Sequence, residues 1–280
     1  MNLKKVRIVE VGPRDGLQNE KAIVPLETKR AFLAALAASG LSDIEMGAFV
    51  RPDRVPQMAD TEALVAGLPA GPTWWGLVPN LKGAERAAKA GLKAVAVFTA
   101  ASETFNRKNI NASIAESLAS NREVAEFSKR ENLRTRAYVS TCFGCPYEGK
   151  VPAARVVEVS RALLDLGFPE ISIGDTIGVG VPAQVEEVFG TLLKLGPASA
   201  FAGHFHDTRG TALANVLAAM ELGISSFDAS AGGLGGCPFA PGAPGNLATE
   251  ALVRRLQALG VETGVDAGLV AEAAKTLRIG

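Results

Sequence analysis

The chain contains two histidines, His204 and His206, and they lie two residues apart. Residues i and i+2 of a β-strand face the same side, so both imidazoles can bind one metal ion. The alternative is a pair of ordinary strand histidines, one of them bonded to a backbone carbonyl. The metal interpretation requires a third ligand, and an acidic side chain suits that role. Four carboxylates compete for it on sequence grounds: Asp15, Glu45, Asp175 and Asp207.

The ligand types leave the metal, and hence the chemistry, open. Two imidazoles and a carboxylate also describe the facial triad of Fe(II) oxygenases. Mg²⁺ or Mn²⁺ is favoured if the remaining ligands are oxygen donors. Asn246 offers such an oxygen, but an Asn just before a helical stretch at residues 248–259 is also a good N-cap. The residue types alone favour the cap.

Cys237 lies in a segment dense in glycine and proline, residues 232–245 (GGLGGCPFAPGAPG). Such a segment predicts a loop that closes over a substrate, and a thiol on it could transfer a proton. The alternative role is that of a small apolar filler residue. Cys142 and Cys145 have the spacing of a redox pair or of half a zinc site. Because the chain has no second such pair, we expect loop thiols that line or support a site.

Arg14 stands beside Asp15, and Arg is a fixed cation with several N–H donors. Next to a metal it could clamp a carboxylate or polarise a carbonyl oxygen, although a surface ion pair is the commoner fate of an Arg. Lys21, Lys108 and Asn109 could bind phosphates. Taken singly, each of these three is more often an ordinary solvated residue.

The elements that must position these side chains alternate along the whole chain. Helical periodicity follows each short β-rich run, and an extra helix is expected at residues 266–277. Glycines stand where helices should end, at residues 40, 91, 167, 223 and 260. The expected strands are residues 6–11, 44–49, 73–78, 94–98, 135–140, 170–173, 201–205 and 226–229.

Eight such units predict one (β/α)₈ barrel domain over residues 1–280. An open doubly wound sheet is the alternative, weakened because no Gly-x-Gly-x-x-Gly follows the first strand. Active sites of barrels lie at the C-terminal ends of the strands, where the polar residues above converge. Strands one and seven are two apart in a closed barrel, which favours Asp15 as the third ligand.

Composition excludes several classes of function. Lys+Arg and Asp+Glu both number 29, so we expect neither nucleic acid nor an anionic membrane as a partner. Apolar residues make up 48% of the chain, enough for a large core. Three cysteines are too few for a disulfide scaffold, and no apolar run could span a bilayer. Without a signal or transit segment, the expectation is a cytoplasmic protein.

Six segments, in order, resemble those of 3-hydroxy-3-methylglutaryl-CoA lyases, and the resemblance covers nearly the whole chain. This family is part of a wider group of metal-dependent aldolase-like barrels. The segments are residues 11–21 (VGPRDGLQNEK), 144–149 (GCPYEG), 174–180 (GDTIGVG), 204–207 (HFHD), 233–238 (GLGGCP) and 245–250 (GNLATE).

The resemblance implies a (β/α)₈ barrel that cleaves 3-hydroxy-3-methylglutaryl-CoA to acetyl-CoA and acetoacetate with Mg²⁺ or Mn²⁺. It also implies an acyl-CoA substrate and a homodimer. The implied metal ligands are Asp15, His204, His206 and Asn246, which reverses the expectation of an N-cap. Cys237 is implied as the acid/base on a mobile loop, and Arg14 as the residue that polarises the substrate. The other implied site residues are Glu45, Asp175 and Glu250 near the reaction, and Gln18, Lys21, Lys108 and Asn109 toward the substrate and its CoA.

Alternatives remain open within the resemblance. Ala48 stands where relatives have hydroxylated residues, which raises the alternative of a longer or branched 3-hydroxy-3-alkylglutaryl-CoA as substrate. A condensing synthase of the same superfamily is another, although the chain lacks the long C-terminal regulatory region often found there. A metal-binding barrel without catalysis is the non-enzyme alternative.

Overall fold

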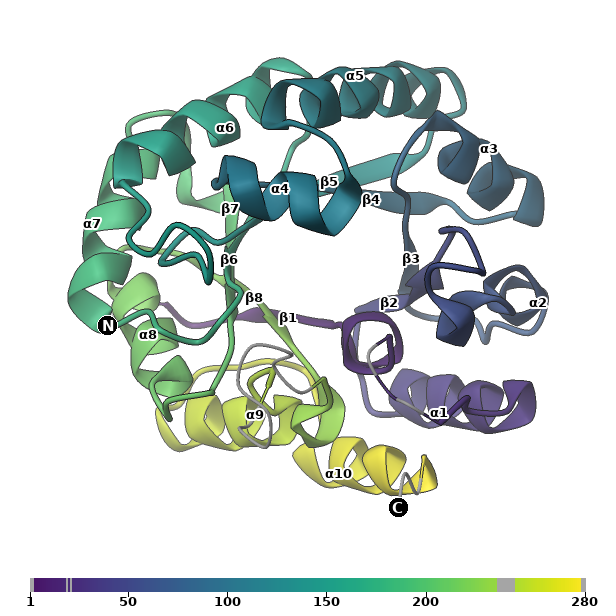
Figure 1. The fold of residues 1–280 in the computed structure, drawn as a ribbon. Coiled ribbons are helices and arrows are strands. Elements are labelled where there is room, and N and C mark those ends of the chain that lie inside the picture. The colour runs from purple at the N-terminus through teal and green to yellow at the C-terminus, as the bar shows by residue number, and fades with distance from the viewer. Residues whose placement is uncertain (1–2, 19, 21, 236–244, 278–280) are drawn as a thin grey trace.

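The computed structural model describes residues 3–18, 20, 22–235 and 245–277. Its eight parallel strands form a closed barrel in chain order, with β8 paired to β1 (Figure 1). The strands are β1 Arg7–Glu10, β2 Asp43–Ala48, β3 Thr73–Leu77, β4 Ala94–Ala100, β5 Arg134–Ser140, β6 Ile171–Asp175, β7 Phe201–Phe205 and β8 Ser226–Ala229. The expected barrel is confirmed, and the doubly wound alternative is wrong.

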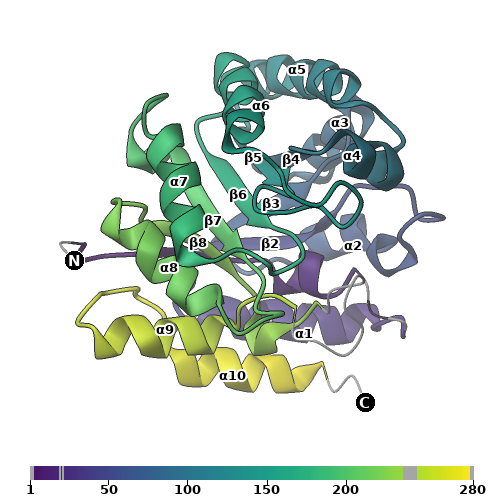
Figure 2. The same ribbon diagram turned by 60° about the vertical axis from the view of Figure 1, so that its left-hand side comes forward.

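Helices surround the barrel on the outside (Figures 1 and 2). The last of them, α10, packs against both α1 and α9, so it extends the outer layer where the first and last units meet. The α-helices are α1 Leu26–Ala38, α2 Thr61–Val65, α3 Leu81–Ala90, α4 Glu103–Ile110, α5 Ile114–Arg130, α6 Ala153–Asp165, α7 Pro182–Leu192, α8 Ala212–Glu221, α9 Thr249–Ala258 and α10 Ala267–Thr276. Short turns of helix are η1 Gly12–Gly16, η2 Pro56–Met58, η3 Ala198–Ala200 and η4 Ala231–Gly233.

The strand boundaries follow the expected ranges to within two residues. The main difference is β6, which continues to Asp175 and therefore carries this carboxylate on the strand itself and not in the following loop. The five glycines expected at helix ends all have left-handed backbone, with φ between 73° and 100°. Only glycine adopts this conformation at little cost, which is why these helices end where they do.

N-cap side chains explain why several helices begin at these residues. The Ser113 hydroxyl accepts a hydrogen bond from the backbone N–H of Glu116, and the Glu116 carboxylate accepts one from the backbone N–H of Ser113, a capping box for α5. Asn80 caps α3 and Asp266 caps α10 through similar hydrogen bonds. Such caps are each worth about 1 kcal/mol.

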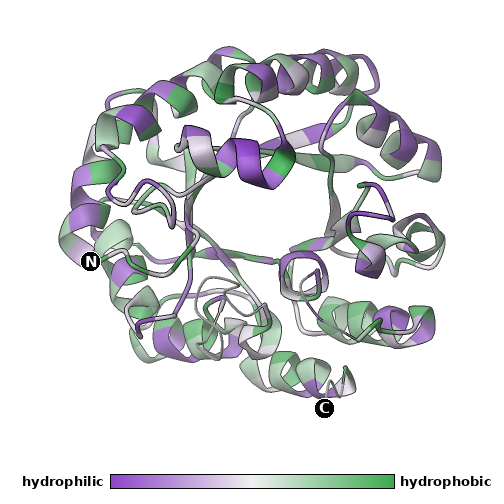
Figure 3. Cartoon of the chain, in the orientation of Figure 1, coloured by the Kyte–Doolittle hydropathy of each residue, from purple (hydrophilic) through white to green (hydrophobic). Residues whose placement is uncertain are grey.

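The barrel strands are buried on both faces, as expected for parallel strands covered by helices. The surrounding helices mix hydrophilic and hydrophobic residues along their lengths, since one face of each packs on the barrel (Figure 3). A few fully buried strand residues are charged, among them Glu10, Glu45, Arg136 and Asp228. Buried charge is costly unless it is paired, so these residues mark where the fold serves something other than packing. In the described ranges, no helix is both long and apolar enough to cross a membrane.

Candidate active site

The turn after β1 positions Arg14 and Asp15. Residues Gly12–Gly16 form one turn of π-helix, in which the amides of Asp15 and Gly16 both donate to the carbonyl of Val11. Such wide turns are rare and are frequently found at functional sites. Glycine is required at position 12 because the backbone there passes close to the Glu10 side chain, and a Cβ would lie 2.6 Å from Glu10 Oε1. The turn carries the Arg14 and Asp15 side chains to the C-terminal end of the barrel.

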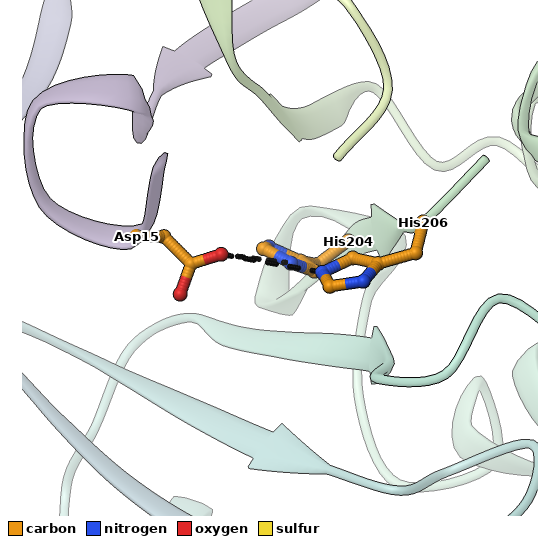
Figure 4. Close-up of side chains that lie close together, drawn as sticks. All are labelled: Asp15, His204 and His206. Atoms are coloured by element: carbon orange, nitrogen blue, oxygen red, sulfur yellow. Dashed lines mark ion pairs between the residues drawn. The ribbon is translucent and has the colours of Figure 1, made fainter. Parts of the chain in front are cut away.

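Asp15, after β1, points toward His204 and His206, at the end of β7, with only β8 between these two strands (Figure 4). Each offers one ligand atom, and the three atoms lie within 4.8 Å of one another. Asp15 Oδ2 is 3.9 Å from His204 Nε2 and 4.0 Å from His206 Nε2. The expectation that both imidazoles point to the same side is confirmed, with ring centroids 5.3 Å apart. Two ring nitrogens and a carboxylate oxygen around one point form a possible divalent-metal site.

Burial and local charges give Asp15 and His206 protonation states that suit this use. Burial alone would raise the pKa of Asp15, but Arg14 and the histidines outweigh it and lower that pKa to about 2. Burial, helped by the neighbouring His204, lowers the pKa of His206 to about 4. Burial would lower the pKa of His204 too, but the hydrogen bond and charge of Asp228 raise it instead. At neutral pH Asp15 is therefore a carboxylate and His206 a neutral imidazole, the forms that bind metal ions.

Asn246 faces Asp15 and does not cap a helix. Its Nδ2 donates to Asp15 Oδ2 over 2.9 Å and to the carbonyl of Leu234 over 3.1 Å. Helix α9 begins later, with Ala248 at the N-cap position, so the interpretation of Asn246 as an N-cap is wrong. Rotation of the amide exchanges its nitrogen with its oxygen, which would present to a cation the atom that it needs.

Arg14 forms a buried fork with Glu45. Arg14 Nε and Nη2 donate to the two oxygens of Glu45 over 3.0 and 3.2 Å, and Nη1 donates to Asp15 Oδ1 over 2.5 Å. The hydroxyl of Tyr138 donates to the same Glu45 carboxylate. Burial would lower the pKa of Arg14, but Glu45 and Asp15 raise it well above its usual value. Arg14 is thus a permanent cation fixed beside the triad, and the alternative of a surface ion pair is wrong.

Glu10, at the end of β1, ties together three segments that carry the site. Its Oε1 accepts hydrogen bonds from the amides of Gly12 and Ala231, both over 2.8 Å, and its Oε2 accepts from the hydroxyl of Thr249 over 2.6 Å. These contacts connect the turn of Asp15 to η4 and to the start of α9, just after Asn246. Burial raises the pKa of Glu10 to about 7 in spite of these hydrogen bonds.

The other carboxylates that the sequence offered as site residues accept hydrogen bonds from backbone amides of nearby turns. Asp175 is fully buried and accepts from the amides of Val179 and Gly180 over 3.0 and 2.9 Å, and burial raises its pKa to about 6. Asp207 accepts from the first amide of α8 over 3.0 Å. Glu250 accepts from the amide of Gly232 over 3.0 Å. None of these, nor Glu45, belongs to the triad found among the described residues.

Besides Arg14, only Gln18 among the described residues predicted to bind the substrate contacts the triad. Gln18 lies beside the triad, with its Nε2 3.4 Å from Asp15 Oδ1. Lys108 and Asn109 are exposed on α4, and Lys108 Nζ lies 4.3 Å from the ring centroid of Tyr147. Lys21 and Cys237 lie outside the described residues. Their roles stay predictions.

Cys142 and Cys145 are buried free thiols. Cys142 Sγ donates to the carbonyl of Val139 over 3.0 Å, and burial raises the pKa of this thiol. Cys145 Sγ accepts from the amides of Tyr147 and Glu148, each over 3.4 Å. The two thiols support the loop after β5, as expected, and they do not form a redox pair in this structure.

Comparisons with known proteins agree with this geometry. The profile of the HMGL-like family matches residues 5–277. The chain belongs to the HMGL-like family. The hydroxymethylglutaryl-CoA lyase of Bacillus subtilis is 50% identical over 274 residues, which cover 97% of this chain and 92% of the relative.

Solved structures place the HMGL-like chain among lyases of the same fold. A crystal structure of the Bacillus subtilis HMG-CoA lyase superposes with a TM-score of 0.96 at 49% identity, covering 98% of this chain and 93% of the other. An HMG-CoA lyase from Acinetobacter baumannii, in complex with coenzyme A and 3-methylmalate, has a TM-score of 0.92 at 39% identity and covers 98% and 90% of the two chains. These likenesses favour neither a condensing synthase, an Fe(II) oxygenase, nor the longer-chain substrate raised by Ala48.

Sequence reasoning missed the residues that hold the site in place. Tyr138 donates to Glu45, and Asp228 lies beside His204. Arg136 donates to both Tyr138 and Asp228, and Glu10 holds segments that carry the site. A signal existed, because charged residues interrupt strands that should be continuously apolar in a parallel barrel. Most of their partners come from distant segments of the chain, and such pairing is not readable from local pattern.

Proposed function

We propose that this protein cleaves 3-hydroxy-3-methylglutaryl-CoA to acetyl-CoA and acetoacetate, using Mg²⁺ or Mn²⁺ bound by Asp15, His204 and His206. Asn246 completes the protein ligands. One observation carries the proposal: these three side chains converge on one point in a chain half identical to named lyases over nearly its whole length.

The donor set fits a divalent ion. His206 is neutral and Asp15 ionised at neutral pH, and the amide of Asn246 adds a hard oxygen once it is rotated. Oxygen donors beside the imidazoles favour Mg²⁺ or Mn²⁺ over softer metals. When bound, such an ion polarises the substrate oxygens, so that a hydroxyl proton is lost more easily near neutral pH.

The reaction is a retro-Claisen cleavage. The hydroxyl at C3 loses its proton, a ketone forms at C3, and the electrons of the C2–C3 bond pass to C2 and its thioester as an enolate. Protonation of C2 then gives acetyl-CoA, and the other fragment is acetoacetate. The low pKa of Asp15 favours the role of ligand over that of the base that takes the hydroxyl proton.

Arg14 stabilises the negative charge that develops during cleavage. Its bonds to Glu45 and Asp15 occupy three of the five N–H donors of a guanidinium. Within the described part of the chain, one hydrogen on each Nη is left for a substrate oxygen. Because Glu45 holds the guanidinium by two bonds, this cation is already in place before charge develops, which is the arrangement that stabilises a transition state most effectively.

Cys237 is our candidate for protonating the enolate carbon. Its support is the sequence and the position of the flanking residues, since Cys237 itself lies outside the described residues. On one side, a Cβ on Gly235 would lie 3.2 Å from the Asp15 carbonyl. On the other side, Gly245 accepts from the amide of Asp207. General acid help is worth about 10²- to 10⁴-fold, so Cys237→Ala should lower kcat at least tenfold while Cys142→Ala should not.

Lys21, Lys108 and Asn109 are proposed to meet the CoA part of the substrate, with Gln18 closer to the metal. The support for Lys108 and Asn109 is their exposure on α4, the helix that follows the C-terminal end of β4. A homodimer and a cytoplasmic location also stay predictions. Light scattering coupled to size exclusion tests the first, and cell fractionation tests the second.

A coupled assay of acetyl-CoA release tests the proposal directly. The purified protein should release acetyl-CoA from 3-hydroxy-3-methylglutaryl-CoA, lose activity in chelator and regain it with Mg²⁺ or Mn²⁺. His206→Ala should lose both metal affinity and rate. Metal-independent release, or a His206→Ala variant with full affinity and rate, would contradict the assignment.

A further inference from the structure

The two proposed histidine ligands have different surroundings at Nδ1, the ring nitrogen that faces away from Asp15. His204 Nδ1 lies 3.2 Å from Asp228 Oδ2, whereas His206 Nδ1 is buried with no partner among the residues that the structure describes. His204 and Asp228 are neighbours across the parallel pairing of β7 and β8. The fold therefore gives one imidazole a dedicated carboxylate.

Asp228 is itself held on both oxygens. Arg136 Nη2 donates to its Oδ1 over 2.9 Å, and the hydroxyl of Ser172 donates to its Oδ2 over 2.6 Å. The side chains of Arg136 and Asp228 are 1% and 0% exposed, so the pair is removed from solvent. Paired with a guanidinium, Asp228 is an acceptor only, and the hydrogen between it and His204 must then belong to the imidazole Nδ1.

This carboxylate is one end of a buried polar network that leads back to Asp15. Arg136 Nη1 donates to the hydroxyl of Tyr138 over 3.1 Å, Tyr138 donates to Glu45, and Glu45 accepts the fork of Arg14, which also contacts Asp15. The network thus runs under the site from one proposed ligand to another. It contains three carboxylates and two guanidiniums, a balance that favours a cation at its open side.

We propose that Asp228 is a positioning residue for the metal, which keeps the proton of His204 on Nδ1 so that Nε2 is free to bind the divalent ion. This inference rests on the metal site proposed above and adds a residue to it. Carboxylate partners of this kind fix the ring orientation of a ligand histidine, and their loss typically weakens metal affinity about 10- to 100-fold.

Asp228→Asn should reverse the tautomer of His204. The amide oxygen must face the guanidinium of Arg136, because an N–H there would point at another donor. The amide nitrogen then faces His204 Nδ1 and donates to it, so the ring proton moves to Nε2. The neutral ring can no longer bind a metal through Nε2, although its position is almost unchanged.

The experiment uses the fact that the chain has only two histidines. With ¹⁵N-labelled histidine, NMR of the metal-free protein distinguishes protonated from unprotonated ring nitrogens, at a pH high enough for both rings to be neutral. His206→Gln assigns the two sets of signals. We expect Nδ1–H for His204 in the wild type and Nε2–H in Asp228→Asn, with Mn²⁺ binding measured by electron paramagnetic resonance about 10- to 100-fold weaker in the variant.

Ser172→Ala is the matched control, since it removes one hydrogen bond to Asp228 and leaves the contact with His204 in place. It should retain the wild-type tautomer and bind Mn²⁺ within a few-fold of the wild type. An Nε2–H tautomer of His204 in the wild type would overturn the inference even if Asp228→Asn does not fold. Unchanged Mn²⁺ affinity in a folded Asp228→Asn would also overturn it. Neither readout uses 3-hydroxy-3-methylglutaryl-CoA, so failure of the wild type to cleave that substrate would refute the proposed function alone.

Discussion

Glu10→Gln should change how the stability of this protein depends on pH. Glu10 is fully buried, and burial raises its pKa from 4.5 to about 7. A group whose pKa is higher in the folded than in the unfolded state stabilises the fold when protonated, and that contribution is lost as the pH rises through the folded value. For a change from 4.5 to about 7 the whole contribution is about 3 kcal/mol.

Gln is nearly isosteric with Glu and keeps the geometry of the site. Its oxygen can accept from the amides of Gly12 and Ala231, and its NH₂ can donate to the hydroxyl of Thr249, which then acts as acceptor. The variant therefore lacks the titrating carboxyl but keeps the three hydrogen bonds. Between about pH 5 and about pH 8, the wild type should lose about 2 to 3 kcal/mol more of its free energy of unfolding than Glu10→Gln does.

Urea unfolding at several pH values measures this difference. Glu85→Gln, at an exposed helix position, is the control for removal of one carboxylate and should follow the wild type. Parallel pH dependences of wild type and Glu10→Gln would refute the reasoning, because they would mean that Glu10 stays ionised in the fold at little cost. If Glu10→Gln lowered the free energy of unfolding equally at every pH, the Glu10 carboxylate would be needed for its hydrogen bonds, and its charge would not destabilise the fold.

Two further predictions concern close packing and thiol burial. Gly235→Ala should weaken Mn²⁺ binding as well as stability, because φ is 97° there and the new Cβ would lie 2.8 Å from Asn246 Nδ2. Gly260→Ala is the control, because φ is 73° there and no atom lies within 4 Å of the new Cβ. It should lower only the free energy of unfolding, by the backbone cost of about 1–3 kcal/mol. Equal Mn²⁺ affinities in the two variants would contradict this prediction. In a Cys237→Ser background, the native protein should react with a thiol reagent only after unfolding, since burial raises the pKa of Cys142 and Cys145 is also buried. Rapid labelling of the native variant would show that the loop after β5 opens.

The parts of the site that follow from local periodicity could be predicted from the sequence. The spacing of His204 and His206 on a strand implies a shared side, and the closure of eight βα units brings the end of the first strand toward them. That closure favours Asp15 among the acidic candidates. Asn246 shows the limit of this reasoning: its neighbours suggest a helix cap, and only the resemblance placed it among the ligands.

The network beneath the site could not be predicted in this way. Arg136 and Asp228 are 92 residues apart in sequence, and each alone is a charge inside a strand that should be apolar. Which strands are neighbours follows from the barrel, but which side chains meet across its interior depends on register and on their reach. Glu10 is similar, since its partners Ala231 and Thr249 come from the other end of the chain.

A crystal of this protein soaked in Mn²⁺ tests the central claim most directly, through the anomalous scattering of manganese. We predict one strong anomalous peak, at bonding distance from Asp15 Oδ2, His204 Nε2 and His206 Nε2. A peak at another position, or no peak among these three atoms at saturating Mn²⁺, would contradict the metal site on which the proposed cleavage depends.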